Sequence, residues 1–165
     1  MQKQVNINDA LLRKYPEQVV LAITRNDEGK VNLMAIGWIC MVSDDPVMFL
    51  TGIDDHAYTL EQIRRQKEFV IAFPSQAMAG AVLYAGTVHG HNVDKAAGSQ
   101  LAFAQASQIN VPILADAVAN FECRLKAEYR PGNCPLIVGE VVAASVNVDE
   151  SVRRLINAGP GYQLQ

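Results

Sequence analysis

VANFECRLKAEYR, residues 118–130, alternates apolar and polar side chains along most of its length. A period of two predicts a β-strand with one buried face and one solvent-facing face. Pro131-Gly132-Asn133 predicts the turn that follows, because proline and glycine favour reversals of the chain. The next stretch, 136–148, is apolar on both faces, so it is expected to be a central strand or one covered by a partner.

Shorter strands are expected before this long one. Val19–Thr24 and Val31–Trp38 flank the polar turn Arg25–Lys30, which contains a glycine, and this arrangement predicts a β-hairpin. A second turn is expected at Val42–Pro46. Two more strands are then predicted, at Val47–Thr51 and Phe69–Phe73.

Three helices are also expected. The first begins at Asp54-Asp55-His56, where a carboxylate can accept free backbone N–H groups, and its apolar face is formed by Leu60 and Ile63. The second is capped by Ser75 and ends near Tyr84. A last short helix is expected to begin at Asp149 or Ser151 and to end at Gly159.

These elements predict a mainly β fold in one domain, residues 1–165. Six or seven sequential strands joined by hairpins favour an antiparallel sheet that closes into a β-barrel with helical insertions, since closure removes exposed edges. The strands that are apolar on both faces also favour a homodimer.

Composition excludes several classes of function. The net charge is -3 and the sequence pI is about 5.6, so nucleic-acid binding and attachment to anionic membranes are not expected. No apolar run is long enough to cross a bilayer, and the N-terminus lacks a signal-peptide core. Of the three cysteines, Cys40 and Cys123 are expected to be buried, whereas Cys134 lies in a turn. Three cysteines without paired spacing favour the cytoplasm.

Common catalytic motifs are absent. Gly86–His91 is glycine-rich but matches neither the dinucleotide-binding fingerprint nor the P-loop. His56, His89 and His91 could together ligate zinc or iron, although loop histidines that donate hydrogen bonds are the simpler interpretation, and no metal is expected. No serine lies in a nucleophile elbow. Residue spacing alone therefore identifies no reaction and no catalytic side chain.

A family resemblance begins at Asn32-Leu33-Met34-Ala35-Ile36-Gly37-Trp38. This segment resembles the flavin reductase-like family, and within it the flavoredoxin-like group. The similarity continues in order over nearly the whole chain, through Ser43–Pro46, His56–Thr59, Glu68–Ile71, Phe73–Ser75, Gly86-Thr87, Gly90, Val93–Lys95 and Gly139–Val141.

The resemblance implies an FMN-binding split β-barrel of antiparallel Greek-key type, forming a homodimer with the flavin near the subunit interface. It implies that Asn32 and Trp38 lie near the isoalloxazine ring, and that Thr59 and Lys95 hold the phosphate. Backbone groups near Met34, Ala35 and Thr51 would meet the polar edge of the ring. His56, His91, Cys134 and Tyr162 complete the expected FMN site.

Elementary chemistry agrees with these roles. A hydroxyl near a helix N-terminus and a lysine suit a phosphate, and an indole offers a flat apolar wall for the ring. Simpler interpretations stay open: Trp38 as core, Lys95 as solvated surface, Thr59 as a helix cap and Asn32 as a strand-edge residue.

The sequence also departs from the family pattern. His91 stands where the family usually has arginine, and Cys134 stands where the closest group has histidine. If His91 contacts the phosphate, FMN should bind more weakly as its imidazole loses its proton. His89, Ala72 and Ala96 also replace usual residues.

We therefore expect an FMN-dependent oxidoreductase that passes electrons from NADH, NADPH or a protein donor such as a ferredoxin. In such enzymes the cofactor supplies the chemistry. The alternatives are an FMN electron-transfer protein of flavoredoxin type and a flavin-binding module without turnover.

Overall fold

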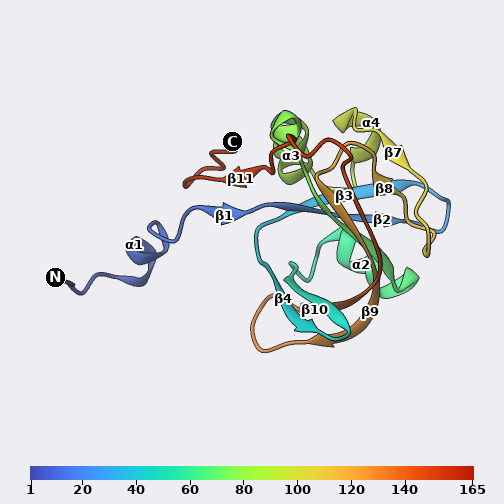
Figure 1. The fold of residues 1–165 in the computed structure, drawn as a ribbon. Coiled ribbons are helices and arrows are strands. Elements are labelled where there is room, and N and C mark those ends of the chain that lie inside the picture. The colour runs from blue at the N-terminus through green and yellow to red at the C-terminus, as the bar shows by residue number, and fades with distance from the viewer.

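The computed structural model describes residues 1–165, and its main element is a seven-stranded antiparallel sheet (Figure 1). The strand order is β3-β2-β6-β9-β10-β5-β4. The bounds are β2 Val20–Arg25, β3 Val31–Ile36, β4 Ile39–Asp44, β5 Val47–Gly52, β6 Glu68–Phe73, β9 Ala119–Tyr129 and β10 Leu136–Val146. The predicted mainly β architecture is confirmed.

The long hairpin at the centre of the sheet follows the sequence pattern. β9 and β10 pair along most of their length, with register shifts at Val138/Gly139 and Val141/Ala143. β10 also pairs with β5, so its apolar faces belong to a central strand, as predicted. The hairpin Val20–Arg25/Val31–Ile36 is likewise confirmed.

The polar face of β9 is less exposed than the alternation predicts. Asn120 and Glu122 are both buried. The Glu122 carboxylate accepts backbone N–H groups from Ser107 at 2.8 Å and Gln108 at 2.7 Å. These contacts lower its pKa against the effect of burial. The loop before β9 therefore covers this half of the strand, and the prediction of a solvent-facing side is wrong there.

Two further predictions are wrong. The expected turn at Val42–Pro46 is shorter, because β4 continues to Asp44 and reverses at Asp45-Pro46. No helix follows Asp149: its carboxylate accepts the Ser151 N–H at 2.9 Å and hydroxyl at 2.7 Å, a local turn that competes with helix. The chain then forms β11, Ile156–Asn157, which pairs with β1, Glu17–Gln18.

The first predicted helix, α2, spans Tyr58–Gln66 and buries Leu60 and Ile63 as expected. Its N-cap is Ala57, which makes no side-chain cap; Asp54 instead accepts the His56 N–H at 2.8 Å. The second begins as a 3-10 turn, η1 (Gln76–Met78), and continues as α3 (Ala79–Thr87), beyond its predicted end. The remaining elements are α1 Ile7–Leu11, α4 Lys95–Ser99, β7 Phe103–Ala104 and β8 Ile113–Leu114.

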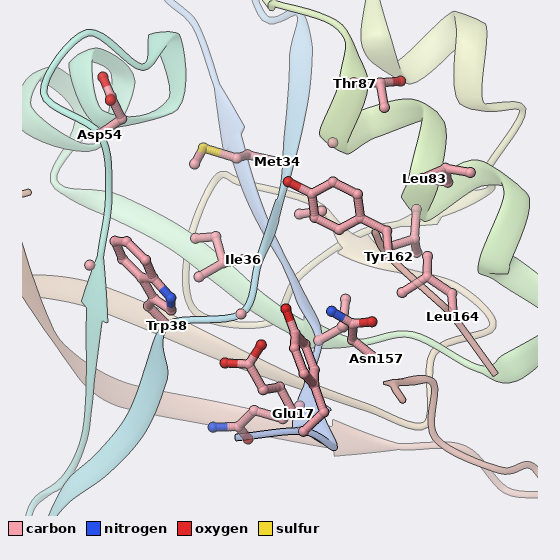
Figure 2. Close-up of a pocket in the computed structure, with 18 of the residues that line it drawn as sticks. Glu17, Met34, Ile36, Trp38, Asp54, Leu83, Thr87, Asn157, Tyr162 and Leu164 are labelled. Atoms are coloured by element: carbon pink, nitrogen blue, oxygen red, sulfur yellow. The ribbon is translucent and has the colours of Figure 1, made fainter. Parts of the chain in front are cut away.

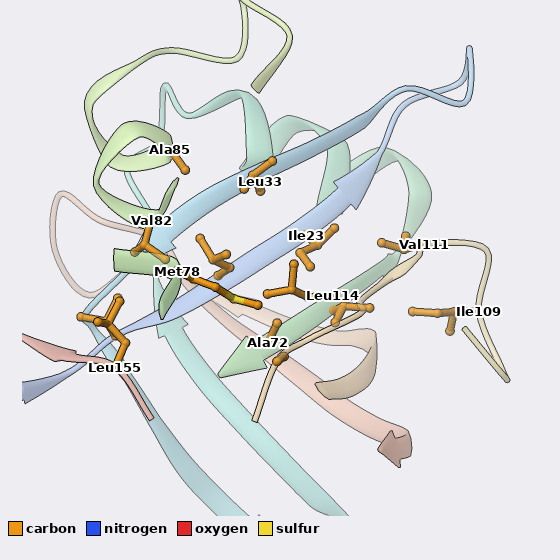
Figure 3. Close-up of a cluster of buried hydrophobic side chains, with 14 residues drawn as sticks. Ile23, Leu33, Ala72, Met78, Val82, Ala85, Ile109, Val111, Leu114 and Leu155 are labelled. Carbon is orange, nitrogen blue, oxygen red and sulfur yellow. The ribbon is translucent and has the colours of Figure 1, made fainter. Parts of the chain in front are cut away.

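The sheet separates two apolar cores. One lies inside the curled sheet, where Ile36 and Ile39 from the two edge strands meet Ile137 from β10. The other lies on the opposite face, beneath α3 and the β8 region, and is built on Leu21, Ile23, Leu33, Val82 and Leu114 (Figure 3). Alternate residues of β2 therefore serve different cores, as the period of two requires.

The N-terminal end of the chain lies apart from this body, whereas the C-terminal tail packs against it through Leu164. α1 buries no residue and projects away from the sheet (Figure 1). None of the helices is long and apolar enough to cross a membrane.

All three cysteines are free. Cys123 is buried as predicted, and burial raises the pKa of its thiol to about 12. The prediction that Cys40 is buried is wrong: Cys40 is exposed, because β4 is an edge strand.

Candidate functional site

A pocket of about 520 Å³ opens beside β3 (Figure 2). We call it the apolar pocket, since most of its walls are hydrophobic. The residues that line it are Lys14, Tyr15, Glu17, Gln18, Val19, Met34, Ala35, Ile36, Gly37, Trp38, Gly52, Asp54, Val82, Leu83, Gly86, Thr87, Cys134, Asn157, Tyr162 and Leu164.

The position of β3 at the edge of the sheet makes this wall suitable for a ligand. Its inner side pairs with β2, and no strand pairs with its other side. In an antiparallel ladder, alternate residues direct their N–H and C=O groups away from the partner strand. The strand thus offers unpaired backbone donors and acceptors beside apolar side chains such as Met34 and Ala35.

Three aromatic side chains border the apolar pocket: Tyr15, Trp38 and Tyr162. Trp38 is 62% exposed and Tyr162 is 67% exposed, so neither ring belongs to the core. Tyr162 has a φ of 61° and follows Gly161 at 78°, and this tight turn in the C-terminal tail brings its ring over the pocket (Figure 2). The interpretation of Trp38 as a core residue is therefore wrong.

A second, polar pocket of about 360 Å³ lies farther along β3. We call it the polar pocket. It is lined by Asn26, Lys30, Val31, Asn32, Tyr58, Gly90, His91, Asn92, Val93, Asp94 and Lys95. Asn32 in this pocket and Met34 in the apolar pocket are two residues apart on one strand, about 7 Å along the chain. One elongated molecule could therefore reach both pockets.

Lys95 brings to the polar pocket a buried ammonium that has no ion-pair partner. Its side chain is only 6% exposed, and its ammonium donates one hydrogen bond, to the carbonyl oxygen of Ala85 at 2.8 Å. No carboxylate pairs with it, and burial lowers the pKa of this lysine. A buried ammonium without a counter-ion is costly unless an anion is bound beside it. Lys95 is therefore not a solvated surface lysine.

Asn32 has a free acceptor in the same region. Its amide nitrogen donates to Thr59 Oγ1 at 2.9 Å and to Thr24 Oγ1 at 3.3 Å, whereas its buried Oδ1 has no partner. Gly90 lies directly over it: a Cβ there would be 2.5 Å from Asn32 Oδ1. An unpaired buried polar atom is unfavourable in a folded protein, so it indicates a place where a ligand donor or a water fits.

The structure divides the expected site residues between the two pockets. Met34, Ala35, Trp38, Cys134 and Tyr162 line the apolar pocket, and Asn32, His91 and Lys95 line the polar pocket.

The other three expected residues line neither pocket. Thr59 is buried behind Asn32, and the Thr51 hydroxyl donates to the Trp38 carbonyl at 3.0 Å. His56 is exposed, so the structure does not bring it to the site.

His91, in the polar pocket, stacks edge-on against Tyr58, with 4.9 Å between ring centroids, and its Nε2 is 3.6 Å from Glu61 Oε2.

Several lining residues carry no recognisable signal in the sequence. Lys14, Tyr15 and Glu17 come from the N-terminal segment, and Asn157 and Leu164 come from the C-terminal tail. The pairing of β1 with β11 brings these two segments together. No group of three or more His, Cys, Asp or Glu side chains is placed to hold a metal ion.

Comparison with known proteins identifies the family. The model of the flavin reductase like domain matches residues 12–163. An uncharacterised protein of Pyrococcus abyssi is 33% identical over 129 residues, which are 78% of this chain and 73% of that protein. An uncharacterised protein of Archaeoglobus fulgidus is 30% identical over 128 residues, 78% of this chain and 71% of that protein.

Solved structures agree with this assignment. Flavoredoxin from Methanosarcina acetivorans superposes with a TM-score of 0.87 at 26% identity, covering 100% of this chain and 90% of that one. An FMN-binding protein from Thermus thermophilus, solved with 1-cyclohex-2-enone, gives 0.81 at 26% identity, covering 98% and 92%. The expected family and split-barrel fold are confirmed, and this chain belongs to the flavin reductase-like family.

Proposed function

We propose that residues 1–165 form one FMN-binding domain, with the isoalloxazine ring in the apolar pocket and the phosphate in the polar pocket. The observation that carries this proposal is the placement of the two pockets along one edge strand, β3. A flat apolar wall lies at one end, and Lys95, which is buried without an ion-pair partner, lies at the other. The flavoredoxin and the FMN-binding protein at 26% identity support the same cofactor.

The residues of the polar pocket fit a phosphate. Lys95 would provide a charge-assisted donor, and His91 in its protonated form a second. Asn32 Oδ1 is a free acceptor, which suits a ribityl hydroxyl better than a phosphate oxygen. Thr59 would act through Asn32, because its hydroxyl already accepts the Asn32 amide.

The residues of the apolar pocket fit a flat ring. Trp38 and Tyr162 would cover its faces, and unpaired backbone groups of β3 near Met34 and Ala35 would meet its polar edge. Cys134 would lie at the rim. Bound FMN would supply the redox chemistry, and the side chains would hold, orient and shield it.

A comparison of FMN with riboflavin tests this arrangement. Riboflavin lacks only the phosphate, so it should bind the apo-protein roughly 10- to 100-fold more weakly, the range of one or two charge-assisted hydrogen bonds. Isothermal titration with both ligands measures the difference. Equal affinity for the two would contradict the phosphate role of the polar pocket.

We infer that the function is electron transfer through FMN from NADH, NADPH or a protein donor. Similarity to a flavoredoxin also favours the second candidate, an electron-transfer protein that is reduced by a protein such as a ferredoxin. Anaerobic mixing separates them: rapid bleaching by NADH or NADPH indicates a reductase, and bleaching only by reduced ferredoxin indicates a carrier. A protein that binds FMN and is reduced by neither is a binding module.

Our proposal includes a cytoplasmic homodimer that binds neither nucleic acid nor membrane. The exposed apolar residues of β4, Met41 and Val42, continue from Trp38 and would be covered by a second copy. Three free cysteines suit a reducing compartment. Sedimentation over a dilution series tests the dimer, and release of FMN on dissociation would support a shared site.

A further inference from the structure

The N-terminal segment, residues 1–13, is exposed over its whole length. We call it the N-terminal arm. Its helix α1 buries no residue, and a helix of five residues is not stable in water unless one side is packed. Ile7 and Leu11, four residues apart, form one apolar side of α1 and are 79% and 49% exposed. The arm therefore needs a surface that covers this side.

The edge of the sheet at β4 also needs a cover. β4 pairs only with β5, and its Met41 and Val42 are 60% and 48% exposed. The register shift between Met41 and Ser43 is a bulge, which bends the edge away from a further strand. A helix or a loop therefore suits this edge better than an added strand does.

The charges beside the two surfaces are complementary. Lys3 and Arg13 lie on either side of α1, are exposed and form no salt bridge. Asp44 and Asp45, where β4 ends, are exposed and equally unpaired. If α1 lay along β4, the cations of the arm would come close to these carboxylates, which favours the contact.

The positions of the two surfaces favour a contact between copies. Within one chain α1 lies apart from β4 (Figure 1). The pairing of β1 with β11 holds the arm where it leaves the body, beside Tyr15 on the rim of the apolar pocket. The exposed surface of β4 begins at Trp38, on the rim of the same pocket. A two-fold axis beside this rim would bring each arm to the β4 of the other copy, and such an exchange closes with two copies.

We propose that the N-terminal arm docks on β4 of a second copy of this chain, with the apolar side of α1 against Met41 and Val42. The arm of each copy then shields the exposed Trp38 of the other, so that each FMN site is completed by the partner's arm. This inference rests on the proposed homodimer and identifies the segment that makes its contact.

Serine substitutions test the apolar contact. The double variant Ile7→Ser with Leu11→Ser should leave the fold of one copy unchanged, because neither side chain is buried there. The dissociation constant of the dimer should rise at least tenfold, as measured by sedimentation over a dilution series. Val148→Ser is the matched control, since Val148 is 99% exposed and lies outside both the arm and β4. A dimer that ignores the double variant would overturn the inference.

Charge reversal tests where the arm lies. Arg13→Glu should weaken the dimer several-fold, and adding Asp44→Lys and Asp45→Lys to the same chain should restore it, because opposite charges meet again. Arg153→Glu is the control, since Arg153 is an exposed cation outside the arm that forms no salt bridge. Without the rescue, the arm does not lie along β4 and the inference fails.

A cross-link shows which copy provides β4. Cys40 supplies one exposed thiol on β4, and Leu11→Cys in a Cys134→Ser background supplies another on α1. With a short bismaleimide and a mixture of isotope-labelled and unlabelled protein, linked peptides of mixed label should join position 11 to Cys40. Asp9→Cys, on the opposite side of α1, is the control and should link less. Links formed only within one copy would overturn the inference.

These measurements use the apo-protein, so they do not depend on the cofactor. Failure of the natural chain to bind FMN, with the link between copies present, would contradict the proposed function alone. A chain that binds FMN but stays monomeric, or whose dimer ignores the arm substitutions, would overturn this inference and leave FMN binding standing.

Discussion

The Lys95 ammonium donates a hydrogen bond to the Ala85 carbonyl oxygen at 2.8 Å, which joins the start of α4 to the end of α3. It is the only hydrogen bond that the buried Lys95 ammonium donates. Because Gly86 and Thr87 follow directly and line the apolar pocket, the same contact lies between the two halves of the proposed FMN site.

Replacing Lys95 by methionine should weaken FMN binding and stabilise the apo-protein. FMN affinity should fall roughly 10- to 100-fold, because a charge-assisted donor to the phosphate is lost. The apo-protein should melt at a higher temperature, because an unpaired buried charge is replaced by an apolar chain of similar length. Titration calorimetry and thermal unfolding measure the two effects.

The pH dependence of unfolding adds a second signature. Burial lowers the pKa of Lys95 in the folded state, so its charge is unfavourable at neutral pH. That penalty is relieved as pH rises through the lowered pKa, while the unfolded chain still binds the proton. The stability advantage of Lys95→Met should therefore shrink at alkaline pH. Lys30→Met is the control: Lys30 lines the same pocket but is exposed and paired with Glu28.

Replacing His91 by arginine should tighten FMN binding by several-fold. A guanidinium is always charged and can donate two parallel hydrogen bonds to a phosphate, whereas one imidazole N–H donates a single hydrogen bond to the same phosphate. Fluorescence titration with FMN measures the gain. His89→Arg serves as the control, since His89 is exposed and lies outside the polar pocket. Equal gains from both variants would indicate a general charge effect.

Local patterns were sufficient to predict several strands. β9 was predicted within two residues from its alternation, and β2 was predicted as closely from its apolar run and the polar turn after it, because both signals depend on neighbours in the sequence. The burial of Glu122 was not predictable in this way. It depends on Ser107 and Gln108, which fold over the strand from a separate loop. β4 was missed because it is an edge strand with exposed apolar residues and no alternation.

The same distinction between local and distant contacts explains which residues of the site could be predicted from the sequence. The family resemblance indicated Trp38 and Lys95, which lie in segments that resemble the family, and also Tyr162 in the C-terminal tail. Tyr15 and Glu17 were missed, since they reach the pocket only through the pairing of β1 with β11. Two-residue strands leave no periodic signal, and each forms only because its distant partner is present.

A methyl group at Gly90 should close the polar pocket. The Cβ of Gly90→Ala would be 2.5 Å from Asn32 Oδ1 and 2.8 Å from Tyr58 Cδ1, closer than real contacts allow. The loop must therefore shift, and FMN affinity should fall at least tenfold with little loss of folding. Gly80→Ala is the matched control, because a Cβ there meets nothing within 4 Å and should stabilise α3 by about 0.5–1 kcal/mol. Titration calorimetry with FMN and thermal unfolding compare the two variants.

The ion cluster that joins Asp55 and the last turn of α2 to β9 should make stability depend on acid pH. Arg64 donates to Glu128 at 3.0 and 2.6 Å and to Asp55 at 2.9 Å, and Arg130 also donates to Asp55, at 2.9 and 2.6 Å. Hydrogen bonds from Arg130 and Arg64 lower the pKa of Asp55, and those from Arg64 and Arg130 lower the pKa of Glu128. A carboxylate with a lowered pKa stabilises the fold above its ordinary pKa of about 4, and this contribution is lost as pH falls through the folded-state value.

Arg64→Met should therefore reduce stability at pH 7 and make the loss of stability below about pH 4 shallower than in the natural sequence. Urea unfolding at several pH values measures both effects. Arg65→Met is the control, because Arg65 is more exposed and pairs with Asp27 and Glu61 outside this cluster. If Arg64→Met left the pH dependence unchanged, the cluster would be a surface contact without energetic weight.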